Sequence, residues 1–422
     1  MKILFFTENF PPETNAAATR VFERALYWVK DGNSVTIITS VPNFPFGKVF
    51  DGYKNKHQTE IISGIQVIRV KTYIAPNQGV IRRTLDFLSF MLSGYLAALK
   101  TGRPDIVIST SPQFFCAVAA WWFSKRHALP YIFELGDLWP ASITAVGAMR
   151  PNIMLKFIEL LELKIYRDSD AIVALTQSFK ENLIKRGITE KKIAVIKNGV
   201  DLWRYFPTKR NKDLATQFNI HSKFVIGYIG TIGMAHDLIK MLDVAENIRQ
   251  YKNISFLFAG AGSEYKNLFE EARMRQLDNT CFLPNQPKTR MREVWSLCDV
   301  ALVHLKNTAA LSAVIPSKIF EAMGMGLPII FVGPEGEASQ IVRSTCAGIC
   351  IAPEDTASLA KKILLLAKKT SFYQNLAEKS LAAAPNFSRE QQAIQMLEVI
   401  NTVSKLQNKT GDKIRKLPLK DF

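Results

Sequence analysis

The chain has few of the residues that build disulfide frameworks, metal centres and hydrolytic sites. Its 422 residues include five cysteines, an odd number with no CxxC pair, and five histidines. These counts argue against a disulfide framework or a structural zinc and favour a reducing compartment. Neither H-E-x-x-H nor G-x-S-x-G occurs, so a zinc protease or a serine hydrolase is not supported.

Long apolar runs are also missing. The best candidate, residues 85–99, has 15 residues and includes Asp86, whereas a membrane span takes about 20. A buried core helix is one interpretation. The other is a helix that dips into one lipid leaflet, because residues 69–103 contain six Lys or Arg against Asp86 alone. The apolar start, MKILFF, is expected to be too short for a signal peptide.

Negative charge is scarce relative to positive charge. Lys and Arg number 54 against 37 Asp and Glu, which gives a formal charge of +17. Such a surplus favours an anionic partner, namely nucleic acid, an acidic membrane surface or phosphorylated small molecules. A generally basic surface is the alternative. No Arg-rich arm or zinc-finger spacing is present, so we do not expect a nucleic-acid partner.

Apolar, β-branched runs alternate with stretches of helical periodicity along most of the chain, which predicts βαβ units and parallel sheets. The expected strands are 2–6, 34–40, 65–70, 105–110, 130–135, 171–176, 192–199, 223–231, 254–260, 300–305 and 328–333. The expected helices are 18–32, 114–127, 236–250, 263–276, 316–326 and 356–369.

This alternation breaks once, which predicts two doubly wound, Rossmann-like domains facing a cleft. Residues 1–200 form the first domain, 201–222 a linker, and 223–386 the second domain. Residues 387–405 are expected as a terminal helix and 406–422 as a basic, flexible tail.

Two glycine-bearing turns follow strands of the second domain. Gly230 and Thr231 follow one strand, and Gly260 and Gly262 follow the next. Such turns expose backbone N–H groups and can receive phosphate at the carboxyl edge of a sheet. Neither turn is a G-x-G-x-x-G or Walker motif, so a plain tight turn is the alternative for each.

The segment LSAVIPSKIFEAMGMGLPII, residues 311–330, is more specific. A helix starting after the proline would place Ser317 and Lys318 in its first turn, where N–H donors, a hydroxyl and an ammonium can hold a diphosphate. Glu321 lies one turn further on the same face and could accept hydrogen bonds from a ribose diol. The alternative is an ion pair between Lys318 and Glu321 within the helix.

Two polar positions stand out in the first domain. Asp137 follows a strand in IFELGDLWP and can orient a sugar or acceptor hydroxyl, although it could simply cap a turn. Asn15 lies in the first loop with Glu13, Thr14 and Arg20, where a helix N-cap is the alternative.

Together these segments resemble the family 4 retaining glycosyltransferases, which have the GT-B fold of two Rossmann-like domains. The similarity covers nearly the whole chain and looks closest to the fucosamine-transferase-like subgroup of bacterial surface-polysaccharide assembly. The segments that carry it occur in the expected order: KILFFTENFPPE, RPDIVISTSP, FELGDLWP, VIKNGVD, GYIGT, FAGAG and PSKIFEAMGMGLPII.

The resemblance implies transfer of a sugar from a nucleotide donor, most often UDP-linked, without a metal or other cofactor. The acceptor would be a lipid-linked saccharide in O-antigen or capsule synthesis, met by a cytoplasmic enzyme peripheral on the anionic inner face of the membrane. Asp137 and Lys318 are the expected catalytic residues. The expected substrate-binding residues are Asn15, Asn198, Gly230, Thr231, Gly260, Gly262, Pro284, Ser317 and Glu321.

The sequence departs from the family pattern at four places. Ala313 stands where many relatives have a second glutamate, and Gly136 where many have a histidine. Ala17-Ala18 replaces a Gly-Gly pair, and residues 232–239 offer His236 as the one possible cation where Arg and Lys are common. Lys318 would then carry most of the diphosphate charge.

Two other functions fit parts of the sequence. A nucleotide-sugar 2-epimerase also uses two Rossmann-like halves, but should show more acids and histidines in its cleft. A basic nucleic-acid-binding protein fits the charge, but no recognition element supports it.

Overall fold

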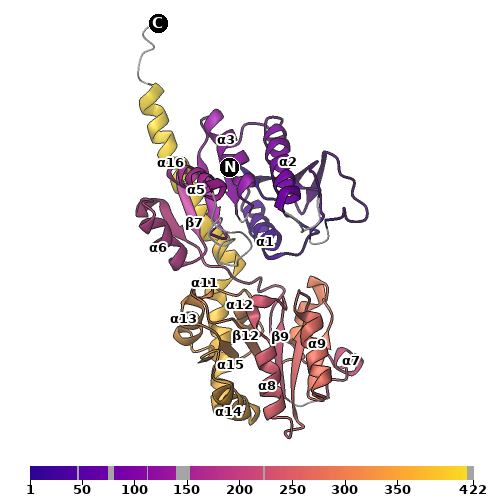
Figure 1. The fold of residues 1–422 in the computed structure, drawn as a ribbon. Coiled ribbons are helices and arrows are strands. Elements are labelled where there is room, and N and C mark those ends of the chain that lie inside the picture. The colour runs from indigo at the N-terminus through magenta and orange to yellow at the C-terminus, as the bar shows by residue number, and fades with distance from the viewer. Residues whose placement is uncertain (45–46, 75–79, 112, 139–152, 222–223, 416–422) are drawn as a thin grey trace. The chain divides into compact units, whose positions relative to one another are not determined.

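The computed structural model describes residues 1–44, 47–74, 80–111, 113–138, 153–221 and 224–415. These residues form two compact units (Figure 1). The first is Met1–Lys197 with Glu390–Phe422, and the second is Asn198–Arg389. Each unit is built on one sheet flanked by helices, as the alternating sequence pattern predicts.

In the described residues the first unit has an eight-stranded sheet, parallel except at one edge. Its strands, in spatial order, are β3 (Gln58–Ile62), β4 (Ile65–Val70), β2 (Ser34–Ser40), β1 (Lys2–Phe6), β5 (Ile106–Thr110), β6 (Tyr131–Leu135), β7 (Ala171–Ala174) and β8 (Ile193–Val195). Most are runs of buried β-branched and aromatic residues, as expected for strands covered on both faces.

Helices cover both faces of this sheet. Ile3, Phe5 and Ile37 point to the side of α1 and α16, whereas α2 packs its Gly94 near Phe6 and Ile38 on the other side. The helices of the first unit are α1 (Ala16–Lys30), α2 (Val80–Ala98), α3 (Phe114–Arg126), α5 (Ile153–Asp168), α6 (Gln177–Lys185) and α16 (Arg389–Arg415).

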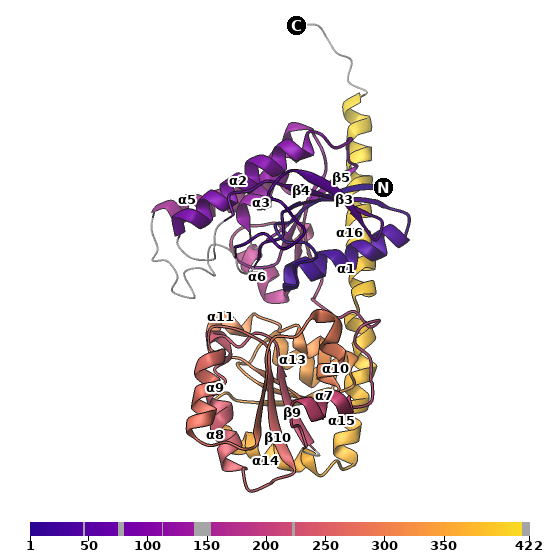
Figure 2. The ribbon, with the colours of Figure 1, turned by 90° about the vertical axis from the view of Figure 1, so that its right-hand side faces the viewer.

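The second unit has a six-stranded parallel sheet among the described residues (Figure 2). Its strands, in spatial order, are β11 (Thr280–Leu283), β10 (Ile254–Ala259), β9 (Phe224–Ile229), β12 (Val300–His304), β13 (Ile329–Val332) and β14 (Gly348–Ile351). The helices are α7 (Lys212–Gln217), α8 (Ile239–Asn247), α9 (Tyr265–Met274), α10 (Met291–Trp295), α11 (Ala309–Ser312), α12 (Lys318–Gly324), α13 (Glu337–Ser344), α14 (Thr356–Ala367) and α15 (Ser371–Ala383).

The predicted strands occur where the pattern placed them, and β2 and β4 have the predicted bounds. The sequence missed three edge strands. QTEII of β3 is half-exposed, partly polar and pairs antiparallel with β4. The other two, β11 and β14, are four-residue, half-buried strands at the edges of the second sheet. The helix expected over 236–250 begins later, at Ile239, because Asp237 has a left-handed backbone with φ of +44°.

The structure places the crossing segments differently from the sequence-based division. Much of the expected linker, 201–222, packs into the second unit, since Tyr205, Leu214 and Ile220 are buried in its core. The terminal helix α16 runs from Arg389 to Arg415, so it includes much of the expected tail. Most of α16 belongs to the first unit, where Met396 and Ile400 pack with Trp28 of α1.

The apolar segment 85–99 forms most of α2, which packs on the sheet through one side only. Phe90, Gly94, Ala97 and Ala98 are buried, whereas Leu92 and Leu96 are exposed. No helix within the described ranges is both long and apolar enough to cross a membrane.

The packing of α16 gives a first prediction. Met396 is fully buried, whereas Ile394 on the same helix is 45% exposed. Met396→Ala should lower the free energy of unfolding of the first unit by about 2–5 kcal/mol, because it removes buried surface and leaves a cavity. Ile394→Ala is the matched control and should change it by less than about 0.5 kcal/mol. Urea denaturation of both variants measures this, and equal effects would contradict the assigned packing of α16.

Candidate functional site

The strand order of the second sheet places a ligand site between β9 and β12. Successive strands run outward from β9 in one direction to β11 and, after a crossover, from β12 in the other direction to β14. Ligands of open parallel sheets bind outside the carboxyl ends of the strands where the order reverses. Gly230 follows β9, and Lys318 follows the loop after β12. A Cβ atom on Gly230 would lie 3.4 Å from the Lys318 ammonium, so the structure brings these two predicted residues together.

Lys318 is the most unusual side chain at this site. Lys318 is only 7% exposed, and its ammonium has no hydrogen-bond partner in the described part of the chain. The Nζ atom lies 3.5 Å from the centroid of the Tyr228 ring. Burial lowers the pKa of Lys318 to about 7, although the nearby Glu321 carboxylate acts in the opposite direction. The ammonium therefore faces the end of β9, and the described residues show no Lys318–Glu321 ion pair.

Ser317 and Glu321 flank Lys318 on the short helix α12. Ser317 is the half-buried N-cap residue, and its side chain makes no capping bond. The Oε2 atom of Glu321 accepts a 3.0 Å hydrogen bond from the indole Nε1 of Trp295, a fully buried residue of α10. This bond fixes the carboxylate and leaves its other oxygen to accept from a ligand. Nothing in the sequence linked Trp295, 26 residues away, to the site.

The two glycine turns contact each other directly. Gly230 donates a backbone hydrogen bond to Ala259, and Ile232 donates one to Ala261, each at 2.9 Å. Gly260 has φ of +146°, and a Cβ atom there would lie 1.9 Å from the Gly230 carbonyl oxygen. The contact between turns thus already requires glycine at 260, before any ligand is considered.

The remaining predicted residues of this unit lie at the same edge of the sheet. Thr231 is exposed beside Gly230, and Gly262 abuts the Ile232 carbonyl. Pro284 is exposed after β11, two strands from the reversal point. Their role in substrate binding stays a prediction.

Two histidines lie near Lys318. His236 Nδ1 donates to the backbone carbonyl of His304 at 3.1 Å. Burial lowers the pKa of each histidine to about 4, and the Lys318 charge contributes to both shifts. At neutral pH both rings are uncharged, so His236 does not supply the second cation that the sequence offered.

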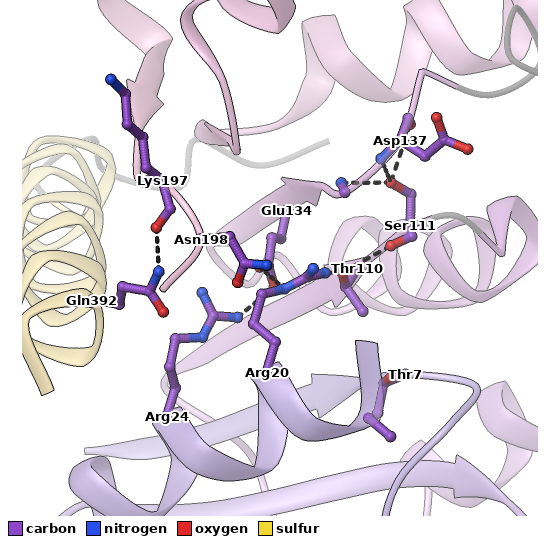
Figure 3. Close-up of polar contacts among 12 residues, drawn as sticks. Thr7, Arg20, Arg24, Thr110, Ser111, Glu134, Asp137, Lys197, Asn198 and Gln392 are labelled. Carbon is purple, nitrogen blue, oxygen red and sulfur yellow. Dashed lines mark hydrogen bonds and ion pairs between the residues drawn. The ribbon is translucent and has the colours of Figure 1, made fainter. Parts of the chain in front are cut away.

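In the first unit a buried charge cluster lies near the ends of β5 and β6 (Figure 3). Glu134 pairs with Arg20 at 3.0 Å and with Arg24 at 2.6 Å. Burial would raise the pKa of Glu134, but the Arg24 and Arg20 guanidiniums outweigh it and hold that pKa below its usual value. Arg20 also donates to the Thr110 hydroxyl at 3.2 Å. Glu134 and the two arginines neutralise one another within the protein. Because the arginines are on α1 and Glu134 is on β6, the cluster fixes α1 against the sheet.

Asp137 follows β6 with a half-buried side chain. The Ser111 hydroxyl accepts hydrogen bonds from the backbone N–H groups of Gly136 and Asp137, at 2.8 and 3.2 Å (Figure 3). A Cβ atom on Gly136 would lie 2.6 Å from the Ser111 carbonyl oxygen and 3.0 Å from Arg20. The position therefore has no room for the histidine found in many relatives. Trp139 and Pro140 of the same motif lie outside the described residues.

The two predicted asparagines have structural contacts. The side chain of Asn15 accepts from the Ala18 N–H at 2.9 Å and caps α1. The side chain of Asn198 accepts from Arg389 at 2.6 Å. Their role in substrate binding stays a prediction. Among the described residues, no group of three or more His, Cys, Asp or Glu is placed to hold a metal ion.

Comparison with known proteins agrees with this architecture. Residues 17–204 match the family described as Glycosyltransferase Family 4, and residues 210–382 match Glycosyl transferases group 1. The chain is 25% identical over 396 residues to the putative colanic acid biosynthesis glycosyl transferase WcaI of Escherichia coli K12, covering 90% of this chain and 96% of that protein.

Solved structures share the fold at low sequence identity. Sucrose-phosphate synthase from Thermosynechococcus elongatus superposes with a TM-score of 0.73 at 15% identity, over 95% of this chain and 98% of that one. Anabaena HepE in complex with UDP gives 0.71 at 17% identity, over 95% and 100%. Two successive parallel-sheet α/β units of this kind define the GT-B class. The chain carries the two domains of a family 4 glycosyltransferase.

The buried lysine gives a second prediction, on stability. The folded-state pKa of Lys318 is about 7 and its ordinary value is 10.5, so burying the charged form costs stability. That cost is full below about pH 7, where both states are protonated, and vanishes as pH rises toward 10.5. Lys318→Met should therefore raise the free energy of unfolding by about 3 kcal/mol at pH 6, with a gain that shrinks at higher pH.

Urea denaturation between pH 6 and 10 measures this effect. Lys362→Met, at an exposed position of α14, is the control and should show no comparable gain. A Lys318 variant that is destabilised at pH 6 would contradict a costly buried charge.

Proposed function

We propose that the protein is a retaining glycosyltransferase that moves a sugar from a UDP-linked donor to a lipid-linked saccharide in bacterial surface-polysaccharide biosynthesis. One observation carries the proposal: an unpartnered, buried ammonium lies where the strand order of the second sheet reverses. A lysine in that position suits a ligand that brings negative charge of its own. The name of the relative from Escherichia coli supports polysaccharide synthesis, and the UDP bound in the HepE structure supports the choice of nucleotide.

In this proposal the residues of the second unit hold the donor. Lys318 meets the diphosphate and stabilises the charge that develops on the leaving nucleoside diphosphate. Ser317 adds a hydroxyl, and the turn after β9 adds the backbone N–H of Thr231, since the Gly230 N–H already donates to Ala259. The carboxylate of Glu321, fixed by Trp295, accepts the ribose hydroxyls. The reaction is proposed to need no metal.

Asp137 is the proposed contact to a sugar or acceptor hydroxyl in the first unit. Its backbone is held by Ser111, which restricts where the carboxylate can point. Membership of the fucosamine-transferase-like subgroup is part of the same proposal. The family matches and the relatives favour sugar transfer over the alternative of a nucleotide-sugar 2-epimerase.

The third prediction separates the two donor contacts. Lys318→Met should weaken binding of both UDP and inorganic diphosphate by about 10- to 100-fold, because it removes the charge that faces the phosphates. Glu321→Ala should weaken UDP binding by about tenfold and inorganic diphosphate binding much less, because in the donor the carboxylate contacts the ribose and it acts on Lys318 only through its charge.

Calorimetric titration of each variant measures these affinities, with Lys362→Met as the control. Transfer activity is scored with a panel of nucleotide sugars ranked by thermal shift, since a bound ligand raises stability. Wild-type affinity of Lys318→Met for UDP would overturn the diphosphate role. Equal losses for UDP and diphosphate in Glu321→Ala would overturn the ribose role.

A lipid-linked acceptor requires contact with a membrane, and α2 has a surface suited to it. Leu85, Leu92 and Leu96 share one side of α2, Leu99 continues that side just beyond it, and these side chains are 47–57% exposed. A helix in contact with water alone would carry polar residues there. Trp122 of α3 stacks on Tyr95 of α2 at 4.6 Å beside this stripe and is also exposed.

A second apolar stripe lies on α5, which packs on the other side of α3. Trp121 of α3 donates to Asp168 of α5 at 3.1 Å. Ile153, Phe157 and Leu160 of α5 are 65–87% exposed. Exposed basic residues accompany both stripes: Arg82, Lys100, Arg103, Lys125, Arg126, Lys156, Lys164 and Arg167. We assign this face, formed by α2, α3 and α5, to an anionic lipid surface, on the cytoplasmic side of the membrane in the proposed function.

The fourth prediction tests this face. The wild type should sediment with vesicles containing phosphatidylglycerol, less so in high salt, and far less with phosphatidylcholine alone. The double variant Leu92→Asp, Leu96→Asp should lose most of this binding. Phe269→Asp with Met274→Asp, two exposed apolar residues of α9, is the control and should retain it. Vesicle binding that survives in the leucine variant would overturn the assignment.

A further inference from the structure

Tyr228, on β9, contacts two separate parts of the candidate donor site with one side chain. The face of its ring lies 3.5 Å from the Lys318 ammonium. Its hydroxyl donates a 2.6 Å hydrogen bond to the backbone carbonyl of Thr231, in the turn after the same strand. Nothing in the sequence pattern distinguishes this tyrosine from the other residues of its buried strand.

The ring contact matters because the other groups around Lys318 stabilise its charge poorly. Glu321, on the same helix, forms no ion pair with it and is bound to Trp295. His236 and His304 lie on the neighbouring segments, and their charged forms are disfavoured by burial. The negative face of an aromatic ring attracts a cation most strongly where water is excluded. Glu321 favours the charged form of Lys318 through its nearby charge, whereas the ring of Tyr228 is the group that contacts the ammonium directly and can hold it in place.

The hydroxyl contact fixes the turn that faces the ammonium. Gly230 lies between Tyr228 and Thr231. The Lys318 ammonium lies so near its Cα that a Cβ atom on Gly230 would be 3.4 Å from Nζ. A shift of this turn would change the distance between the Thr231 N–H and the ammonium. The short bond from Tyr228 to Thr231 opposes such a shift.

We propose that Tyr228 is a positioning residue that holds the Lys318 ammonium with its ring and the 230–231 turn with its hydroxyl, so that both meet the diphosphate in one fixed geometry. The proposal rests on the diphosphate role of Lys318 given above. The ring and the hydroxyl of Tyr228 then have separate roles, which two substitutions can test. Tyr228→Phe keeps the ring and removes the hydroxyl, and Tyr228→Leu removes the ring.

The first experiment needs no ligand. The protein is labelled with ¹³C at lysine Cε, and the Lys318 signal is identified by its absence in Lys318→Met. Tyr228→Leu should lower the pKa of Lys318 by about one unit, because the ring no longer favours the charged form. Tyr228→Phe should leave that pKa unchanged. An unchanged pKa in the leucine variant would overturn the role of the ring.

The second experiment measures binding of inorganic diphosphate and of UDP by calorimetry at several pH values. Tyr228→Phe should weaken both by about three- to tenfold at every pH, since it loses one hydrogen bond that orders the turn. Tyr228→Leu should weaken both by about 30-fold and begin to lose affinity at a lower pH than the wild type. Tyr265→Phe, at a half-buried tyrosine of α9, is the control and should bind as the wild type does.

The outcomes separate this proposal from the proposed function. Wild-type binding in both Tyr228 variants, with a large loss in Lys318→Met, would overturn the positioning role and support the diphosphate role. Wild-type binding in Lys318→Met would overturn the diphosphate role, whereas the lysine titration would still report on the ring contact. If Tyr228→Leu does not fold, Tyr228→Met, which also lacks an aromatic face, supplies the same comparison.

Discussion

The buried charge of Lys318 is the constraint around which the second unit is arranged. An ammonium taken out of water without a hydrogen-bond partner is unfavourable, and its lowered pKa reflects that cost. The neighbouring groups limit the cost without neutralising the charge. Tyr228 offers a ring face, Glu321 is near but bound to Trp295, and Gly230 leaves the space beside Nζ unobstructed. An ion pair within the protein would lower the free-energy cost of burying Lys318, but it would also cancel the charge that makes the position suited to an anion.

The first unit contains buried cations whose charge is paired internally. Arg20 and Arg24 are as buried as Lys318, and they lie close to the carboxyl ends of β5 and β6 in the sheet of the first unit. Their partner Glu134 is fully buried between them, and its pKa is held low by both guanidiniums. That cluster is closed upon itself and supports the fold. Burial of a cation at a strand end is therefore not by itself a sign of a ligand site. The sign is the lack of a paired counter-charge, and this lack distinguishes Lys318 from Arg20 and Arg24.

The sequence predicts those parts of the molecule that depend on short-range patterns. Buried strands such as β1 and β9 are almost entirely apolar runs. The turns after β9 and β10 are marked by the glycines that directly follow those runs. The contacts that complete the site come from residues far apart in the chain. Trp295 donates to Glu321 from another helix, and Ser111, just after β5, accepts from the backbone of Asp137. The outer face of α2 was ambiguous for a similar reason: periodicity shows an apolar helix, but only packing shows which leucines remain exposed.

Two absent side chains limit what these motifs say about the sugar. Gly136 cannot carry the histidine of many relatives, because a Cβ atom there would collide with the Ser111 carbonyl. Ala313, at the C-cap of α11, offers no carboxylate where many relatives have one. The groups that remain, Lys318, Ser317 and Glu321, are suited to charge and to a diol, which are features of the nucleotide half of a donor. Recognition of the sugar must then depend on the shape and backbone of its surroundings. Shape of that kind is produced by the packing of many residues, so donor sugar identity cannot be inferred from these motifs even when the site itself is located.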